Sequence, residues 1–172
     1  MNRIRTASLC AAAIAVVAPL SACGDMASAG AGNPDHGRPG HVMLAATQVA
    51  GVGTVVTDAA GKTLYRFDKD MATPPMSHCE AECATTWPPA LAGEGSPMLE
   101  GIQDSQVGTL ARPDGSKQLT LNGWALYEFS GDKAPGQLNG QGANGTWFAV
   151  APDGSKITAG GQGQPAAGGS GY

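Results

Sequence analysis

The sequence predicts a mainly β protein: a small single domain of two pseudo-repeated β-hairpin units, with a short helical or loop segment that carries C-x-x-x-C. Three observations lead to this fold class. Short runs of β-forming residues are separated by turn-forming residues, one group of aromatic residues occurs twice in the same order, and no stretch has the apolar period of a long helix. A chain of 172 residues, of which 42% are hydrophobic, can build one such domain.

Residues 1–22 have the pattern of a secretory signal. Arg3 and Arg5 form a basic start, an apolar run follows over residues 7–20, and small residues lead directly to Cys23. The apolar run is shorter than the roughly 20 residues that a membrane-spanning helix needs. We therefore expect this segment to be cleaved rather than kept as an anchor.

The Leu-Ser-Ala-Cys ending at Cys23 resembles the lipobox of bacterial lipoproteins, in which the cysteine is acylated and becomes the new N-terminus. The alternative is an ordinary signal peptide with an incidental cysteine. With a lipobox, Cys23 is the lipidation site, and residues 23–48 form a lipidated N-terminus and flexible tether. Because two or more acyl chains hold a protein firmly, we expect an extracytoplasmic protein anchored to a bacterial membrane. Gly24 favours the outer membrane or the periplasmic face in a Gram-negative cell.

The charge of the chain argues against nucleic acid as a partner. Ten Lys and Arg face 14 Asp and Glu, a net charge of −4, and loss of the leader makes the balance more acidic. Nucleic acids and anionic lipids both bind through concentrated Lys and Arg, and the sequence has no basic run. We expect an envelope partner or ligand of unidentified chemistry, and no nucleic acid.

Residues 49–158 form the predicted β-rich domain, and the Gly-rich residues 159–172 are predicted to be a disordered tail because they can bury little apolar surface. Asn122-Gly123 is the strongest hairpin signal, since both residue types tolerate positive φ. Three hairpins are expected: 53–58 with 62–67, 117–121 with 124–129, and 146–151 with 155–158. The one short helical candidate lies at residues 79–86.

One motif, Tyr-x-Phe-x-x-Asp, occurs twice and is followed each time by a tryptophan. Aligning Tyr65 with Tyr127 also places Gly61 on Gly123. The two copies of this series are Tyr65, Phe67, Asp70 and Trp87, and Tyr127, Phe129, Asp132 and Trp147. Each unit then has a hairpin, the motif, a variable loop and a tryptophan. Since a solenoid usually needs three or more repeats, we expect a compact pseudo-symmetric domain.

The ordered series resembles the predicted bacterial lipoproteins and secreted repeats that are named for a Y-x-(F/W/Y)-x-x-D motif. The resemblance includes Cys79 and Cys83, Trp-Pro-Pro at residues 87–89 and the Gly-rich loop before Trp147, and it covers about residues 53–155. The family is defined by its sequence. Some of its members are associated with cell-surface electron transfer. The resemblance therefore implies an extracytoplasmic protein and suggests a redox function.

The motif has the properties of a packing device. Along a strand, Tyr65 and Phe67 point to one face and Leu64 points to the other, so the rings are expected in the core rather than on an exposed ligand platform. Asp70 and Asp132 come where each strand should end, and a carboxylate there can accept backbone N–H bonds and fix the turn. A metal or catalytic role for the two carboxylates is the alternative.

Cys79 and Cys83 are expected to form a disulfide, because an oxidising compartment favours one. A redox-active dithiol and a metal site are the alternatives. Together with Met71, Met76 and His78, the two thiols would suit Cu(I) or haem iron if they stayed reduced. The main interpretation includes no cofactor.

The sequence has no G-x-S-x-G, H-E-x-x-H, phosphate loop or C-x-x-C-H. We therefore expect a membrane-anchored lipoprotein that is not an enzyme and has a binding or structural role at the cell envelope. The alternative is a metal or redox lipoprotein that uses the Met71–Cys83 loop, and a third possibility is an envelope enzyme of unidentified type.

Overall fold

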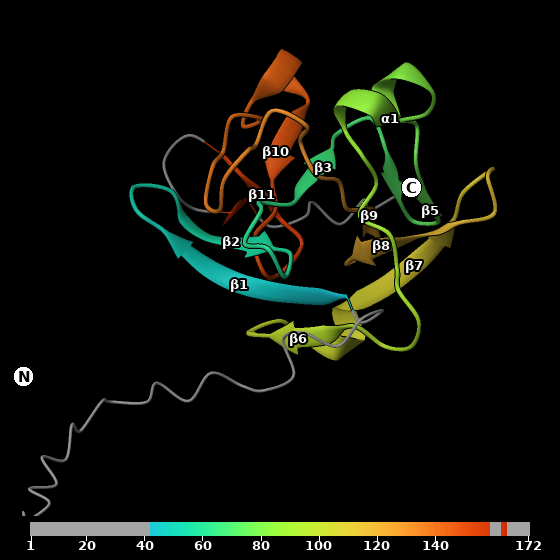
Figure 1. Ribbon diagram of the computed structural model, residues 1–172, viewed down its shortest axis with the longest axis horizontal. Helices are drawn as coiled ribbons and strands as arrows, with labels where there is room; N and C mark the ends of the chain where they lie inside the picture. The colour runs from blue at the N-terminus through green and yellow to red at the C-terminus, as the bar shows by residue number, and fades with distance from the viewer. Residues whose placement is uncertain (1–41, 159–162, 165–172) are drawn as a thin grey trace, which may run out of the picture. The chain divides into compact units, whose positions relative to one another are not determined.

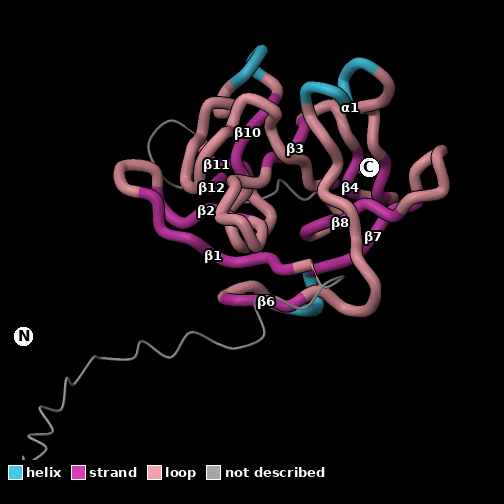
Figure 2. Tube along the Cα trace, in the orientation of Figure 1, coloured by secondary structure: helices cyan, strands magenta, loops and turns pink. Residues whose placement is uncertain are grey.

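The computed structural model describes residues 42–158 and 163–164. The predicted signal segment, Cys23, the tether up to residue 41 and most of the tail lie outside the described residues. The elements in chain order are β1 (Met43–Val49), β2 (Gly53–Thr57), β3 (Tyr65–Phe67), β4 (Met71–Ala72), β5 (Pro75–Met76), α1 (Glu82–Thr86), β6 (Met98–Glu100), the 3-10 turn η1 (Asp104–Gln106), β7 (Val107–Ala111), β8 (Lys117–Leu121), β9 (Trp124–Ala125), the 3-10 turn η2 (Ala143–Gly145), β10 (Trp147–Ala149), β11 (Lys156–Ile157) and β12 (Gly163–Gln164). The predicted mainly β class is confirmed (Figures 1 and 2).

The three predicted hairpins are present. In the second one, β8 pairs with β9 across Asn122 and Gly123, whose φ angles are 50° and 83°. Both angles lie in the left-handed region that Asn and Gly tolerate, which explains why this dipeptide closes a two-residue turn. The first hairpin is closed by a bond from the Asp58 N–H to the Lys62 carbonyl at 3.0 Å, and the third by a bridge between Val150 and Lys156.

The two motif strands pair with each other at the centre of the domain. The Tyr65 N–H donates to the Tyr127 carbonyl at 2.8 Å, and the Tyr127 N–H donates to the Tyr65 carbonyl at 2.9 Å. These reciprocal bonds are the pattern of an antiparallel pair. An approximate twofold axis therefore passes between the two tyrosines and relates the two copies.

Each tryptophan segment pairs with the motif strand of the other copy. β10, which carries Trp147, is antiparallel to β3 of the first copy, and the two strands lie side by side in Figure 1. The segment after Trp87 does the same for the second copy, since the Glu128 N–H donates to the Pro88 carbonyl at 2.8 Å. The repeated series predicts that each copy is a unit that ends in its own tryptophan. The structure instead exchanges these segments, so the two copies are interleaved.

The central strands separate two cores. Leu64 and Leu126 are fully buried in an aliphatic core, while their neighbours Tyr65 and Tyr127 are fully buried in an aromatic core. Adjacent residues of a strand point to opposite faces, so the two cores lie on opposite sides of the same strands. As predicted, the leucines and the tyrosines of the two motif strands point to opposite faces.

The domain begins earlier than the predicted tether boundary at residue 48. β1 pairs antiparallel with β2 and parallel with β6, and its Leu44 is fully buried. Residues 43–48 therefore belong to a sheet rather than to the tether, because β2 and β6 both supply hydrogen-bonding partners to this segment. Within the predicted tail, Gly163–Gln164 pairs with β11.

Candidate functional site

The repeated motif joins the two copies through buried hydrogen bonds. The Tyr65 hydroxyl donates to Asp132 Oδ2 at 2.7 Å, and the Tyr127 hydroxyl donates to Asp70 Oδ2 at 2.7 Å. All four residues are buried. Each tyrosine is therefore bound by the aspartate of the other copy, a pairing that spacing within one motif does not reveal.

The second carboxylate oxygen of each aspartate holds the loop that follows it. Asp70 Oδ1 accepts the His78 N–H at 2.7 Å, and Asp132 Oδ1 accepts the Asn139 N–H at 3.0 Å. The motif predicts a carboxylate that accepts backbone N–H bonds near the strand end. The structure places both aspartates in that role, although the bonded N–H groups lie in the loops beyond the turn.

Burial shapes the protonation of this group. Desolvation, and then the bond to Asp132, raises the pKa of Tyr65 well above its usual value of 10.0, and desolvation also raises that of Tyr127. Burial likewise raises the pKa of Asp70, although its hydrogen bonds favour the charged form. The tyrosines therefore keep their protons and act as donors.

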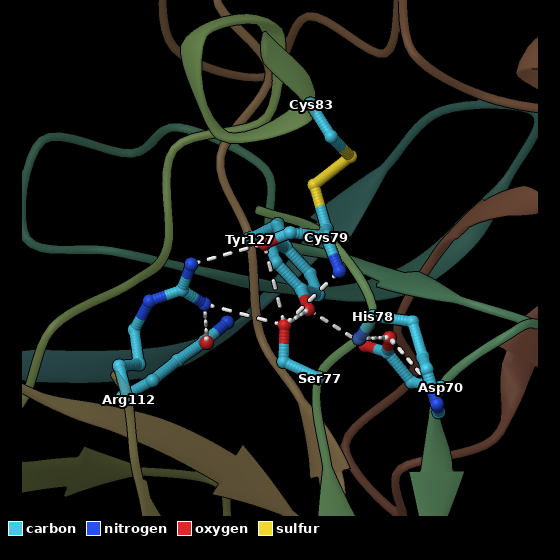
Figure 3. Close-up of polar contacts among 8 residues, drawn as sticks. Asp70, Ser77, His78, Cys79, Cys83, Arg112 and Tyr127 are labelled. Atoms are coloured by element: carbon cyan, nitrogen blue, oxygen red, sulfur yellow. Dashed lines mark hydrogen bonds and ion pairs between the residues drawn. A yellow bond between two sulfur atoms is a disulfide. The ribbon is translucent and has the colours of Figure 1, made fainter. Parts of the chain in front are cut away.

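Arg112 connects this pairing to the cysteine loop (Figure 3). Its Nη2 donates to the Cys79 carbonyl at 2.9 Å, and its Nη1 donates to Ser77 Oγ at 3.2 Å and to Gln118 Oε1 at 2.6 Å. Ser77 Oγ lies 2.7 Å from the Tyr127 hydroxyl oxygen. Because the tyrosine proton is directed to the aspartate of the first copy, the serine hydroxyl is the donor to the tyrosine.

Arg112 and Gln118 are not among the site residues that the sequence predicts. A signal was present, because the segment Pro-Asp-Gly-Ser-Lys occurs word for word at 113–117 and 152–156. The residue before it is Arg112 in one place and Ala151 in the other. A charged residue at only one of two otherwise equivalent turns indicates a contact that is specific to that turn. Here that contact is with the cysteine loop.

Cys79 and Cys83 form the expected disulfide, with their Cα atoms 5.2 Å apart. Cys79 is fully buried, whereas Cys83 is partly exposed and lies in α1. Since the two sulfurs are bonded to each other, they are not free as thiolate ligands. The disulfide fixes the loop between the motif of the first copy and its tryptophan.

The tryptophans of the two copies stack on each other. The ring centroids of Trp87 and Trp147 are 3.9 Å apart with parallel planes, and Phe67 stacks on Trp147 at 4.2 Å. Phe129 contacts Trp87 at 4.4 Å. Phe67 and Phe129 are partly buried at the edge of this cluster. The aromatic residues of the motif thus form one continuous group across the twofold axis.

A cavity of about 350 Å³ adjoins the stacked rings. Its lining includes Cys83 and Thr86 from the first copy and Asn144 and Thr146 from the second. Another cavity of about 450 Å³ lies on the aliphatic side, where Leu44 contributes to its wall. The first cavity is the one that both copies build together with the motif aromatics.

Both copies match the model of one known protein family. Residues 46–91 and 108–151 match the family described as a secreted repeat of unknown function, and together they make up more than half of the chain. The chain belongs to this family. Each matched range contains one motif copy and the hairpin before it. No curated protein and no solved structure matches the chain.

The family resemblance drawn from the motif series is thereby confirmed, and the secreted repeat description agrees with an extracytoplasmic location. Among residues 42–158 and 163–164, no helix is long and apolar enough to cross a membrane. Cys23, the predicted lipidation site of this secreted repeat protein, lies outside the described residues.

The remaining candidates of the secreted repeat protein lie on the β4–β5 hairpin and just beyond it. Met71 and Met76 are direct partners across the two strands, and their exposed fractions are 42% and 46%. His78 has its Nδ1 3.9 Å from Asp70 Oδ1. In the described part of the chain, no three His, Cys, Asp or Glu side chains converge as metal ligands. Any soft-metal site here would therefore depend on the methionines.

Proposed function

We propose that this secreted repeat protein is a membrane-anchored extracytoplasmic lipoprotein whose domain has a non-enzymatic binding or structural role at the cell envelope. The observation that carries the non-enzymatic part is the reciprocal pairing of Tyr65 with Asp132 and of Tyr127 with Asp70. These are the hydroxyl and carboxylate groups that acid-base chemistry would use. Here they are buried and hydrogen-bonded to one another, and these bonds hold the two copies together.

The binding part of the proposal is supported by the cavity beside the tryptophan stack. Its wall combines aromatic surface from Trp87 and Trp147 with polar groups such as Lys69 and Asn144. Binding sites commonly combine an apolar wall with a few polar groups that orient the ligand. Because both copies contribute to this wall, the binding of a partner there would depend on the relative position of the two copies.

The anchor can be tested by labelling cells with a fatty-acid probe. The Leu-Ser-Ala-Cys sequence supports acylation at Cys23, so Cys23→Ala should abolish labelling and leave the precursor unprocessed. Cys10→Ala is the matched control, since it removes the other cysteine of the leader region and should leave labelling unchanged. Labelling that persists in Cys23→Ala would refute the anchor.

The non-enzymatic role can be tested by comparing function with folding. In a strain that lacks the protein and has an envelope phenotype, complementation by Tyr65→Phe and Tyr127→Phe should follow the amount of folded protein. Both variants keep the ring and remove only the hydroxyl. If Tyr127→Phe accumulated normally, melted at the wild-type temperature and still failed to complement, the hydroxyl would have a chemical task and the proposal would be wrong.

A metal-related role is the second candidate function. The observation that favours it is the exposure of Met71 and Met76, which are cross-strand partners and lie close in sequence to His78. The disulfide removes Cys79 and Cys83 from the ligand set considered in the sequence analysis. The ligands that remain define a different site.

A further inference from the structure

We propose that Met71, Met76 and His78 form a Cu(I) site on the β4–β5 hairpin that uses no cysteine. The site deepens the metal-related candidate function proposed above and rests on it, but it does not depend on the lipid anchor. It rests on the pairing of the two methionines, on their exposure, on the orientation of the histidine and on the support of the hairpin by the second copy.

The hairpin register brings the two thioethers together. Met71 and Met76 are direct antiparallel partners. Side chains at such positions leave the same face with Cβ atoms about 4.5–5.5 Å apart. Methionine is unbranched and has three rotatable bonds, so both sulfur atoms can reach one ion above this face without movement of the backbone.

The exposure of this pair has no packing explanation. Among the described residues, the large hydrophobic side chains that are exposed are Met71, Met76 and Leu91. Two of these three therefore face each other on one small hairpin. Exposed apolar surface is unfavourable in water, and a ligand role gives a reason to keep two thioethers there.

The histidine is oriented by the motif aspartate. Asp70 Oδ1 accepts the His78 backbone N–H at 2.7 Å and also lies 3.9 Å from His78 Nδ1. The side chain of His78 is 46% exposed, and His78 follows Met76 by two residues, the spacing at which side chains of an extended segment leave the same side. With Nδ1 facing the carboxylate, Nε2 is the nitrogen that can bind a metal, and a carboxylate behind a ligating histidine is a common support.

The second copy holds the hairpin in place. A Cβ added at Gly123 would lie 2.2 Å from the Ala72 carbonyl oxygen, so the Asn122-Gly123 turn packs directly against β4. The turn approaches this closely only because residue 123 is glycine. The positions of the two methionines are therefore set by a rigid neighbour rather than by an isolated loop.

The chemistry of these groups selects Cu(I). Thioethers are soft ligands that favour Cu(I), and imidazole also binds copper, whereas Mg²⁺ and Ca²⁺ prefer oxygen ligands. Two thioethers and one neutral imidazole carry no charge. The Asp70 carboxylate, whose Oδ1 lies 3.9 Å from His78 Nδ1, can offset the charge of a monovalent cation bound at the other nitrogen of the ring.

The test measures Cu(I) retention by the full chain against a chromogenic Cu(I) chelator under anaerobic conditions. Free thiols are first alkylated without reductant, so that the only unmodified cysteine sulfurs are those of the disulfide and no free thiol can bind the ion. We expect one Cu(I) per chain, with affinity lowered at least about tenfold in Met71→Leu, Met76→Leu and His78→Gln. Met98→Leu is the matched control, because it removes a methionine from β6 and should leave the affinity unchanged.

A second measurement locates the ion without relying on affinity. With Ag(I) as a substitute that resists oxidation and methionine methyl groups labelled with carbon-13, the methyl resonances of two of the six methionines should shift. The methionine-to-leucine changes nearly conserve volume on an exposed hairpin, so the thermal melting of these variants should match that of the wild type. Loss of all Cu(I) to the chelator by the wild type, or retention at wild-type affinity by Met71→Leu and Met76→Leu, would overturn the proposal.

Discussion

Each aspartate of the repeated motif uses its two carboxylate oxygens for two tasks. In Asp70, one oxygen accepts the Tyr127 hydroxyl of the other copy and the other oxygen accepts the His78 N–H of its own loop. Asp132 repeats this arrangement with Tyr65 and Asn139. The motif therefore specifies a contact between copies as well as a local turn, and loss of one hydroxyl leaves a buried carboxylate without one of its partners.

The first prediction concerns that hydroxyl. Tyr127→Phe should lower the free energy of unfolding by about 1.5–3 kcal/mol, because a hydrogen bond to a charged, buried group is lost while the ring stays packed. Tyr65→Phe should cost a similar amount, since its environment is nearly equivalent. Urea denaturation of both variants measures this. Equal stability of wild type and variants would show that these bonds contribute nothing net.

The second prediction concerns alkaline pH. Tyr65 and Tyr127 have pKa values raised by burial above the usual 10.0. Between the usual and the raised values, the unfolded chain has lost protons that the folded chain keeps, so the free energy of unfolding falls as pH rises above about 10. Denaturation measured at pH 8 and pH 11 should show a smaller fall for the Tyr65→Phe, Tyr127→Phe double variant. An identical fall would contradict the raised pKa values.

At the scale of elements, the Asn122-Gly123 turn has two functions. It closes the β8–β9 hairpin, and it makes room for the β4–β5 hairpin because Gly123 has no side chain. A positive φ alone explains the first function. Only the tertiary contact with Ala72 explains the second.

The third prediction separates these two functions. Gly123→Ala adds a Cβ at 2.2 Å from a backbone oxygen at a φ of 83°, whereas Gly115→Ala has a φ of 84° and no atom within 4 Å of its Cβ. Gly115→Ala should therefore cost about 1–2 kcal/mol from the left-handed backbone alone. Gly123→Ala should cost clearly more, as measured by thermal and urea unfolding. Equal losses would mean that the hairpin moves away freely.

At the scale of the whole molecule, the two copies depend on each other. β10 completes the strand pairing of the first copy, and the segment after Trp87 completes that of the second. The stacked tryptophans and the crossed Tyr–Asp bonds add further contacts between the copies. A single copy thus lacks a hydrogen-bonding partner for its motif strand and most of its aromatic core.

The fourth prediction follows from this dependence. Residues 42–102 and 103–158, produced separately, should not give folded monomers. Each should be unfolded or should dimerise with itself, because a second identical copy can supply the missing tryptophan segment. Mixing the two should restore circular dichroism and a native tryptophan emission spectrum. A folded monomer of either fragment, by light scattering and circular dichroism, would contradict the interleaved arrangement.

The local features of this protein can be predicted from its amino-acid sequence alone. Asn122-Gly123 predicted its hairpin turn, since turn geometry depends on a few adjacent residues. The alternation of Leu64 and Tyr65 predicted which side chains share a face. The spacing of Cys79 and Cys83 predicted the disulfide, and the ordered motif series predicted the family.

How the two copies combine could not be predicted from the sequence. Trp87 and Trp147 follow their motifs at similar spacing, so local preferences are nearly the same whether each returns to its own copy or crosses to the other. The choice depends on long-range strand pairing and ring stacking, which involve residues far apart in the chain. The partners of Arg112 and of residues 43–48 are also far away in the chain. A linear sequence pattern carries little information about such partners, so neither the role of Arg112 nor the strand at residues 43–48 was predicted.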